Sequence, residues 1–172
     1  MRTVNEDWYA LFVKSGQEEN IKQRLEYKFS DSMKILIPKR KLKERKNGDV
    51  RVVVRRMFPG YVLLQGDLDV YRYYMLKDTP GIFKLLRTGG EPARVNYWEM
   101  ETLNRLLCNG DTIGFSNCLM KDSKVVVIDG PLLSMEGRIL SVDNRKGRAK
   151  VNISFMGEPR IIDLGISVLQ PA

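Results

Sequence analysis

The chain has 172 residues, enough for one domain or two small ones, and it contains no apolar run near the roughly 18 residues of a membrane span. It carries 29 Lys and Arg against 21 Asp and Glu, for a net charge of +8, with no histidine and two cysteines. This composition argues against a membrane protein, matches no common zinc or thiol-redox motif, and favours an anionic partner such as nucleic acid.

The first predicted elements are a buried strand and an amphipathic helix. Trp8 to Val13 is rich in aromatic and β-branched residues, as expected of a buried strand. Ser15 is the predicted N-cap of the following helix, with Glu18 at the third position after it. The helix carries an apolar stripe with four-residue spacing, formed by Ile21, Leu25 and Phe29.

Positive charge is concentrated in one short stretch. Between Lys39 and Arg56 there are nine basic residues against Glu44 and Asp49. Asn47-Gly48 divides this stretch into two arms and predicts a two-residue hairpin turn. We expect a β-hairpin that projects into solvent and presents its charge to nucleic acid or to an acidic partner; the alternative interpretation is an ordinary solvated face.

The next predicted elements complete the first domain. Pro59 and Gly60 form a stiff corner before a buried strand from 61 to 64. A helix is expected over 69–77, with Val70, Tyr71, Tyr74 and Met75 as its apolar stripe. A strand over 82–86 and a helix capped by Asn96, with Glu99 in the capping-box position, follow.

The last third of the chain predicts a different architecture. Residues 108–117 have the composition of a flexible linker, with two glycines and short polar residues. Beyond them, short strands are expected over 125–128, 137–142, 149–155 and 160–164, separated by Gly- and Pro-containing turns. Regular short strands without a helix indicate a small β-barrel. We therefore expect domains over 1–107 and 118–172.

Four motifs in this order resemble the NusG family of transcription elongation factors. They are Trp8-Tyr9-Ala10 with Ser15-Gly16-Gln17-Glu18, Phe58-Pro59-Gly60-Tyr61-Val62, Thr79-Pro80-Gly81-Ile82, and Asp129-Gly130-Pro131 with Glu136-Gly137. The resemblance covers nearly the whole chain. It implies an α+β fold with an N-terminal NGN domain, an antiparallel sheet flanked by helices and bearing the hairpin, linked to a C-terminal KOW domain, an SH3-like β-barrel.

The resemblance also implies partners and contact residues. The NGN domain is expected to bind the RNA polymerase clamp through Phe12, Phe58, Tyr61 and Leu63, although Phe12, Tyr61 and Leu63 also fit plain sheet core. Arg72, Tyr73 and Tyr74 match positions that contact the opposite lobe of the polymerase; the alternative is that Tyr71 and Tyr74 face the sheet. By this resemblance Arg24 and Lys28 are expected to touch the exposed non-template DNA strand. The hairpin cations, expected to lie near the upstream DNA, are Lys41, Lys43, Arg45 and Lys46.

The barrel is expected to contact nascent RNA or a second factor. The predicted contacts are Arg138, Arg145, Lys146, Arg148, Lys150 and Phe155, with an ordinary solvated turn as the alternative for the cations. The loop Phe155-Met156-Gly157-Glu158 departs from the Phe-Gly-Arg usual in the family, and the chain resembles the specialised paralogs, especially the LoaP group of antiterminators. Local β propensity and punctuating glycines and prolines argue against a helical C-terminal half.

These inferences predict a cytoplasmic, monomeric antitermination factor without a cofactor or a metal. An enzyme is disfavoured because the sequence offers no convergent acid, base or nucleophile set. The main alternative is a KOW-type, ribosome-associated RNA-binding structural protein that does not bind polymerase.

Overall fold

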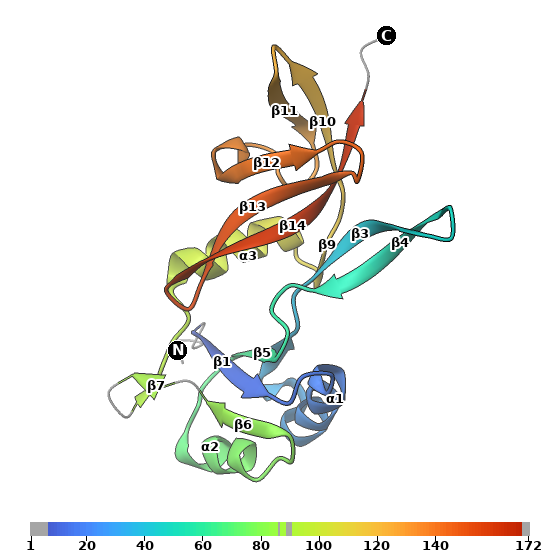
Figure 1. Ribbon diagram of the computed structural model, residues 1–172. Coiled ribbons are helices and arrows are strands. Elements are labelled where there is room, and N and C mark those ends of the chain that lie inside the picture. The colour runs from blue at the N-terminus through green and yellow to red at the C-terminus, as the bar shows by residue number, and fades with distance from the viewer. Residues whose placement is uncertain (1–6, 86, 89–90, 170–172) are drawn as a thin grey trace. The chain divides into compact units, whose positions relative to one another are not determined.

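A computed structural model describes residues 7–85, 87–88 and 91–169. The chain divides into two compact units, one formed by Met1–Ile37 with Phe58–Met100 and the other by Pro38–Met57 with Glu101–Ala172 (Figure 1). Both contain strands, and the helices α1 and α2 belong to the first, so the predicted mixed α+β class is confirmed. In the described part of the chain, no helix is long and apolar enough to cross a membrane.

The first unit is built on a four-stranded antiparallel sheet in the order β2-β5-β1-β6. Two helices and a 3-10 turn connect its strands (Figure 1). The bounds are β1 Trp8–Val13, α1 Glu18–Phe29, η1 Ser30–Ser32, β2 Lys34–Leu36, β5 Tyr61–Gln65, α2 Val70–Lys77, β6 Ile82–Leu85, β7 Arg87–Thr88 and β8 Glu91–Pro92.

One face of this sheet forms a hydrophobic core with α1 and α2. Alternate residues of β1 point into it, because successive side chains of a strand leave opposite faces. The same cluster contains Val62 and Leu64 from β5, the predicted stripe of α1, and Leu76 from α2. Truncation of one of these fully buried leucines to alanine would cost about 2–5 kcal/mol of stability.

The start of α1 differs from the prediction. The N-cap position is Gln17 rather than Ser15, and no side chain caps the helix. Instead, the buried carboxylate of Glu18 turns back and accepts a hydrogen bond from the backbone amide of Gly16. Glu18 therefore satisfies an amide ahead of the helix, the role that a capping box gives to its acidic member.

The predicted apolar stripe of α2 is wrong for Val70, Tyr71 and Tyr74, which are exposed, whereas Met75 packs against the core as expected. Tyr71 and Tyr74 are 73% and 54% exposed, whereas Leu76 is buried and Tyr73 packs against the core. The helix begins where expected, because the Asp69 side chain accepts a hydrogen bond from the Arg72 amide at 2.8 Å. Apart from Arg72 and Lys77 the helix is apolar or aromatic throughout, so its sequence does not single out one buried stripe.

The second unit combines the basic hairpin with the C-terminal strands. Its sheets have the orders β4-β3-β9 and β11-β10-β14-β13-β12. The bounds are β3 Lys39–Lys46, β4 Asp49–Arg56, β9 Thr112–Ile113, β10 Ser116–Lys121, β11 Lys124–Asp129, η2 Glu136–Arg138, β12 Ile139–Asp143, β13 Arg148–Phe155 and β14 Glu158–Leu169; helix α3, Tyr97–Leu107, spans the division between the units. The five-stranded sheet fits the expected SH3-like barrel.

The hairpin turn forms as the sequence predicts. Asn47 and Gly48 adopt φ values of 54° and 84°, and the flanking strands pair from Lys39↔Arg56 to Lys46↔Asp49. Positive φ at both central residues is the requirement of a type I′ turn. The tip is exposed, but Leu42 at the middle of β3 is buried, so one part of the hairpin is packed.

Strand β14 approaches the hairpin closely at a glycine. A Cβ atom on Gly165 would lie 2.5 Å from the backbone oxygen of Lys41 and from ring atoms of Phe115. No side chain fits at that distance, so glycine is required for β14 to reach β3. The predicted linker, 108–117, contains β9 and the first residues of β10, and β9 pairs with β3 in parallel. The domain boundaries stay a prediction.

Candidate polymerase and nucleic-acid interfaces

Three aromatic rings meet on the sheet face of the first unit that is opposite its helix-packed core. Phe12 and Tyr61 are direct cross-strand partners, with ring centroids 5.6 Å apart in an edge-to-face arrangement. The ring of Phe83 lies 5.6 Å from Phe12 on the other side. Phe12 and Tyr61 are half-buried and Phe83 is 62% exposed. We call these three residues the aromatic surface.

The other two predicted clamp residues are not on this surface. Phe58 and Leu63 are 3% and 0% exposed. Phe58 leads into the Pro59-Gly60 corner, and the Tyr61 amide donates to its carbonyl oxygen at 3.2 Å. Their side chains contribute to packing in this structure, so a direct polymerase contact is proposed below only for the aromatic surface.

Sequence reasoning missed Phe83. The register of β1 and β6 shifts between Phe12 and Val13, so Phe12 pairs with Lys84 and Val13 with Ile82. This bulge leaves Phe83 unopposed in the ladder, with its ring against that of Phe12. The run Ile82 to Leu85 indicated a strand, but no local signal marks the bulge.

The predicted opposite-lobe residues have three different environments. The Arg72 guanidinium donates to the backbone oxygen of Asp67 at 2.7 Å. Tyr73 packs against the core, and its ring lies 5.6 Å from that of the exposed Tyr74. Tyr74 therefore offers the most accessible side chain of the predicted triplet, and the exposed Tyr71 is its neighbour on α2.

The predicted DNA-facing cations of α1 both make hydrogen bonds within the first unit. Arg24 donates to the carbonyl oxygen of Pro80 at 3.2 Å, and Lys28 Nζ donates to the Thr79 hydroxyl at 2.7 Å. Both contacts tie α1 to the turn between α2 and β6. The head groups remain exposed enough to meet an anion, but each already has a structural partner.

The predicted hairpin cations also divide into two groups. Lys41, Arg45 and Lys46 are exposed. The ammonium of Lys43 donates to the Ser167 hydroxyl of β14 at 3.1 Å and lies 5.3 Å from the centre of the Phe115 ring. Lys43 thus attaches the hairpin to β14, whereas the other three present their charge to solvent.

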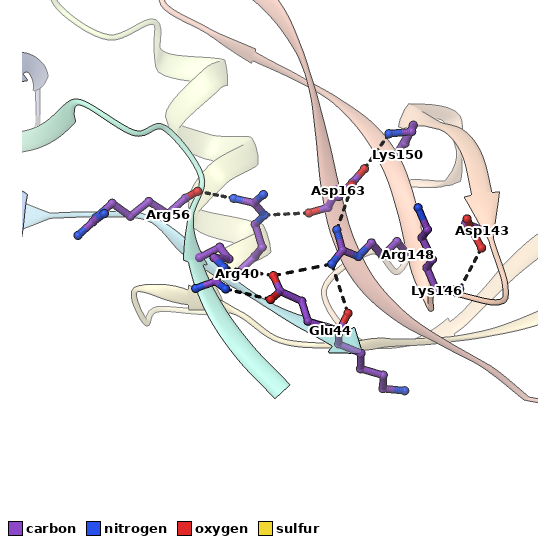
Figure 2. A network of polar contacts seen from close by, with 10 residues as sticks. Arg40, Glu44, Arg56, Asp143, Lys146, Arg148, Lys150 and Asp163 are labelled. Carbon is purple, nitrogen blue, oxygen red and sulfur yellow. Dashed lines mark hydrogen bonds and ion pairs between the residues drawn. The ribbon is translucent and has the colours of Figure 1, made fainter. Parts of the chain in front are cut away.

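Asp163 of β14 contacts basic residues of the neighbouring strands β13 and β3. Asp163 lies 3.4 Å from Nη1 of Arg148 and 3.1 Å from Nζ of Lys150, and its backbone oxygen accepts from Nε of Arg40 at 2.9 Å (Figure 2). Burial raises the pKa of the Asp163 carboxyl, but its contacts with Lys150 and Arg148 outweigh that effect and leave the pKa below its ordinary value.

Arg148 extends this network to the hairpin. Its Nη2 donates to the backbone oxygen of Lys43 at 3.3 Å and lies 4.0 Å from the Glu44 carboxylate. Glu44 in turn pairs with Arg55 across the hairpin at 2.9 Å (Figure 2 shows the network). Burial lowers the pKa of Arg40, partly opposed by Asp163, although an arginine stays protonated at neutral pH.

The remaining predicted barrel contacts differ in exposure. Phe155 is 2% exposed, with the Arg160 guanidinium 5.3 Å from its ring centre, so its side chain belongs to the barrel core. Arg138 is exposed and lies 3.4 Å from the Thr102 hydroxyl. Arg145 and Lys146 occupy the turn between β12 and β13, where the Lys146 amide donates to Asp143 at 2.9 Å. No cluster of potential metal ligands occurs among residues 7–85, 87–88 and 91–169.

Comparison with known proteins identifies the family. A family model described as "Transcription termination factor nusG" matches residues 6–104, more than half of the chain. The chain belongs to the NusG family. The protein named "Transcription termination/antitermination protein NusG" from Haemophilus influenzae is 30% identical over 168 residues, covering 91% of this chain and 89% of its own.

Further relatives extend the match over both units. The Bacillus subtilis protein of the same name is 28% identical over 171 residues, covering 94% of this chain and 96% of its own. A solved structure described as "Domain interaction in Thermotoga maritima NusG" superposes with a TM-score of 0.60 at 24% identity and covers 93% of each chain. The NGN and KOW architecture expected from the motifs is thereby confirmed.

Proposed function

We propose that this NusG-family protein is a transcription elongation and antitermination factor that binds RNA polymerase through its first unit. The observation that carries the proposal is the aromatic surface, where the ring of Phe12 contacts those of Tyr61 and the largely exposed Phe83. Exposed aromatic clusters are unusual on a surface that faces only water, and buried aromatic side chains dominate protein interfaces. The relatives are named as transcription termination/antitermination proteins, which agrees with a polymerase partner.

The second unit is proposed to contact nucleic acid or a second factor. The exposed hairpin cations Lys41, Arg45 and Lys46 and the turn cations Arg145 and Lys146 supply positive charge for phosphates. The buried ring of Phe155 does not support recruitment of a protein through that residue. Membership of the specialised LoaP group, and thus action at selected operons, is part of this proposal and rests on the altered Phe155 loop.

Single-round transcription across a terminator tests the function. Addition of the protein to purified polymerase is expected to raise read-through, and substitution Tyr61→Ala is expected to abolish both the effect and co-purification with polymerase. Undiminished co-purification of the variant would contradict the aromatic surface as the docking site. Binding to ribosomes at high salt without any binding to polymerase would instead support the structural RNA-binding alternative.

A further inference from the structure

A cleft separates the hairpin from the turn between β12 and β13. Its volume is about 800 Å³. All of its walls belong to the second unit: β3 and β4 on one side, the turn on the other, and the end of β14 between them. Its lining includes five cations and two acids, namely Lys43, Arg45, Arg145, Lys146 and Arg148 with Glu44 and Asp143.

The five cations of the cleft fall into two groups, those paired with other residues of the fold and those that are not. Lys43 and Arg148 are held by the Ser167 hydroxyl, the Asp163 and Glu44 carboxylates and a backbone oxygen. The side chains of Arg45, Arg145 and Lys146 make no hydrogen bond or ion pair with any residue that the structure describes. Both acids of the lining are engaged as well, Glu44 with Arg55 and Asp143 with the Lys146 amide. With five cations against two carboxylates, the lining of the cleft carries an excess of positive charge.

The polar contacts of Asp163, Arg148 and Glu44 bring these cations together from distant parts of the chain. Arg45 lies on the hairpin, and Arg145 and Lys146 lie about 100 residues later on the barrel turn. Arg148 connects the two segments, because it reaches Lys43 and Glu44 on β3 from its place next to the turn (Figure 2). Asp163 anchors Arg148 and, through its backbone oxygen, Arg40 of the same hairpin.

We infer that this cleft binds the sugar-phosphate backbone of a nucleic-acid strand, and that Asp163 and Glu44 are positioning residues for it. Arg45 contacts the phosphates from the hairpin side and Arg145 and Lys146 contact them from the turn. The acids touch no phosphate; they hold Arg148 so that the two segments face each other. The inference rests on the proposed function for the nature of the ligand and adds its location and the means of its assembly.

The composition of the cleft favours a phosphate backbone over an acidic peptide. The lining has three large apolar residues, Val50, Ile166 and Val168, against five cations. Regularly spaced phosphates match cations supplied from both walls, and Arg and Lys bind them through charge-assisted hydrogen bonds. Contacts of this kind make the affinity fall with salt concentration.

Substitution Asp163→Asn tests the inference because two physical arguments predict opposite changes in the affinity for nucleic acid. If charge alone governs binding, removal of a negative charge beside the cleft tightens the complex. If Asp163 positions the hairpin, its neutral variant binds more weakly, although no phosphate-contacting cation has been removed. We expect a severalfold loss of affinity for a labelled single-stranded RNA and a salt slope shallower by about 0.7, the contribution of one phosphate contact on a single strand.

Asp122→Asn serves as the matched charge control. Asp122 lies in the β10–β11 turn with φ 51°, a conformation that asparagine also adopts, and it does not line the cleft. This variant should bind RNA as tightly as the unaltered chain or slightly more tightly. Equal or tighter binding by Asp163→Asn would overturn the positioning role.

A distance measurement separates mispositioning from unfolding. With Cys108 replaced by serine, spin labels at positions 46 and 144 report the separation of the hairpin tip from the turn in the full chain. The unaltered network should give one narrow distance distribution, and Asp163→Asn a broader one with the far-ultraviolet circular dichroism preserved. An unchanged distribution together with weakened binding would overturn the mechanism.

The choice of ligands in the binding assay allows this inference to be tested separately from the proposed function. The RNA-binding assay contains no polymerase. If the protein failed to bind polymerase, the proposed function would be contradicted but the measured affinity for RNA would not change. RNA and DNA strands of one sequence distinguish the two nucleic-acid sources, and a poly-glutamate peptide tests the acidic-protein alternative. Binding of the peptide but of neither nucleic acid would overturn the inference while leaving polymerase docking intact.

Discussion

Arg148 on β13 donates from Nη2 to the backbone oxygen of Lys43 on β3, at 3.3 Å and across 105 residues of sequence. A backbone acceptor fixes the position of the strand itself rather than of a flexible side chain. The same guanidinium meets Asp163 and approaches Glu44, so one side chain relates the barrel to the hairpin. The cations that the sequence indicated for nucleic acid therefore include one that organises the others.

The turn cations should account for a measurable part of the salt dependence of RNA binding. The double variant Arg145→Gln/Lys146→Gln removes two unpaired charges from the cleft, and the slope of log K against log salt should become shallower by about 1.4, at roughly 0.7 for each single-strand phosphate contact. Fluorescence anisotropy at several salt concentrations measures this slope.

A matched control removes the same charge elsewhere. Lys121 and Lys124 are exposed partners at the end of the β10–β11 pairing, so Lys121→Gln/Lys124→Gln lowers the net charge equally. Its slope should stay close to that of the unaltered chain. Equal effects of both double variants would show that only net charge matters, contrary to a localised site.

Phe83 should behave as an interface residue rather than a core residue. Because its side chain is 62% exposed, Phe83→Ala is expected to change the free energy of unfolding by no more than about 0.5 kcal/mol while weakening polymerase binding. Surface-immobilised polymerase and urea titration measure the two quantities. Tyr97→Ala, at an exposed tyrosine outside the aromatic surface, is the control and should leave binding intact. Polymerase binding unaffected by Phe83→Ala would remove this residue from the interface.

The comparison of Phe83 with Leu63 shows where sequence reasoning stops. The existence of the main strands and the Asn47-Gly48 turn follow from local patterns, because residue propensity and turn chemistry act over a few residues. The burial of Leu63 agrees with the buried strand predicted over 61–64, which leaves its side chain in the core rather than on a binding surface. The exposure of Phe83 depends on a register shift between β1 and β6, which the local pattern does not encode.

The basic residues show the same limit in electrostatic terms. Composition placed the charge correctly on the hairpin and the barrel turn. It could not distinguish Arg148, which is paired, from Arg145, which is not, because the pairing partners Asp163 and Glu44 come from other strands. An ion pair between distant segments becomes visible only when the sheet registers are known.

Gly165 should be intolerant of any side chain. Since a Cβ atom would lie 2.5 Å from the Lys41 oxygen and the Phe115 ring, Gly165→Ala forces β14 and β3 apart. Overpacking of this kind typically costs about 1–3 kcal/mol of stability, which urea denaturation measures. Gly137→Ala, where nothing lies within 4 Å of the added methyl, should be nearly neutral. Equal stability of the two variants would contradict the close approach of the strands.

The contribution of Asp163 to stability should depend on pH in a defined direction. Its pKa is lowered in the folded chain, with Lys150 and Arg148 outweighing the effect of burial, so the folded state favours the ionised carboxyl relative to the unfolded state. The stabilisation is therefore complete above the unfolded pKa of about 3.9 and is lost as the pH falls through the lower folded value. The free energy of unfolding of the unaltered chain should exceed that of Asp163→Asn by a constant amount near pH 6, and the difference should shrink below about pH 4.

Denaturant titrations of both proteins from pH 6 to pH 3 measure this difference directly. Asp122→Asn provides the charge-matched reference, because no ion pair involves Asp122 in the described part of the chain. A difference for Asp163→Asn that stays constant or grows below pH 4 would mean that the carboxylate gains nothing from Arg148 and Lys150. The network would then fail as the element that holds the hairpin to the barrel, since its central acid would be no better paired when folded than in water.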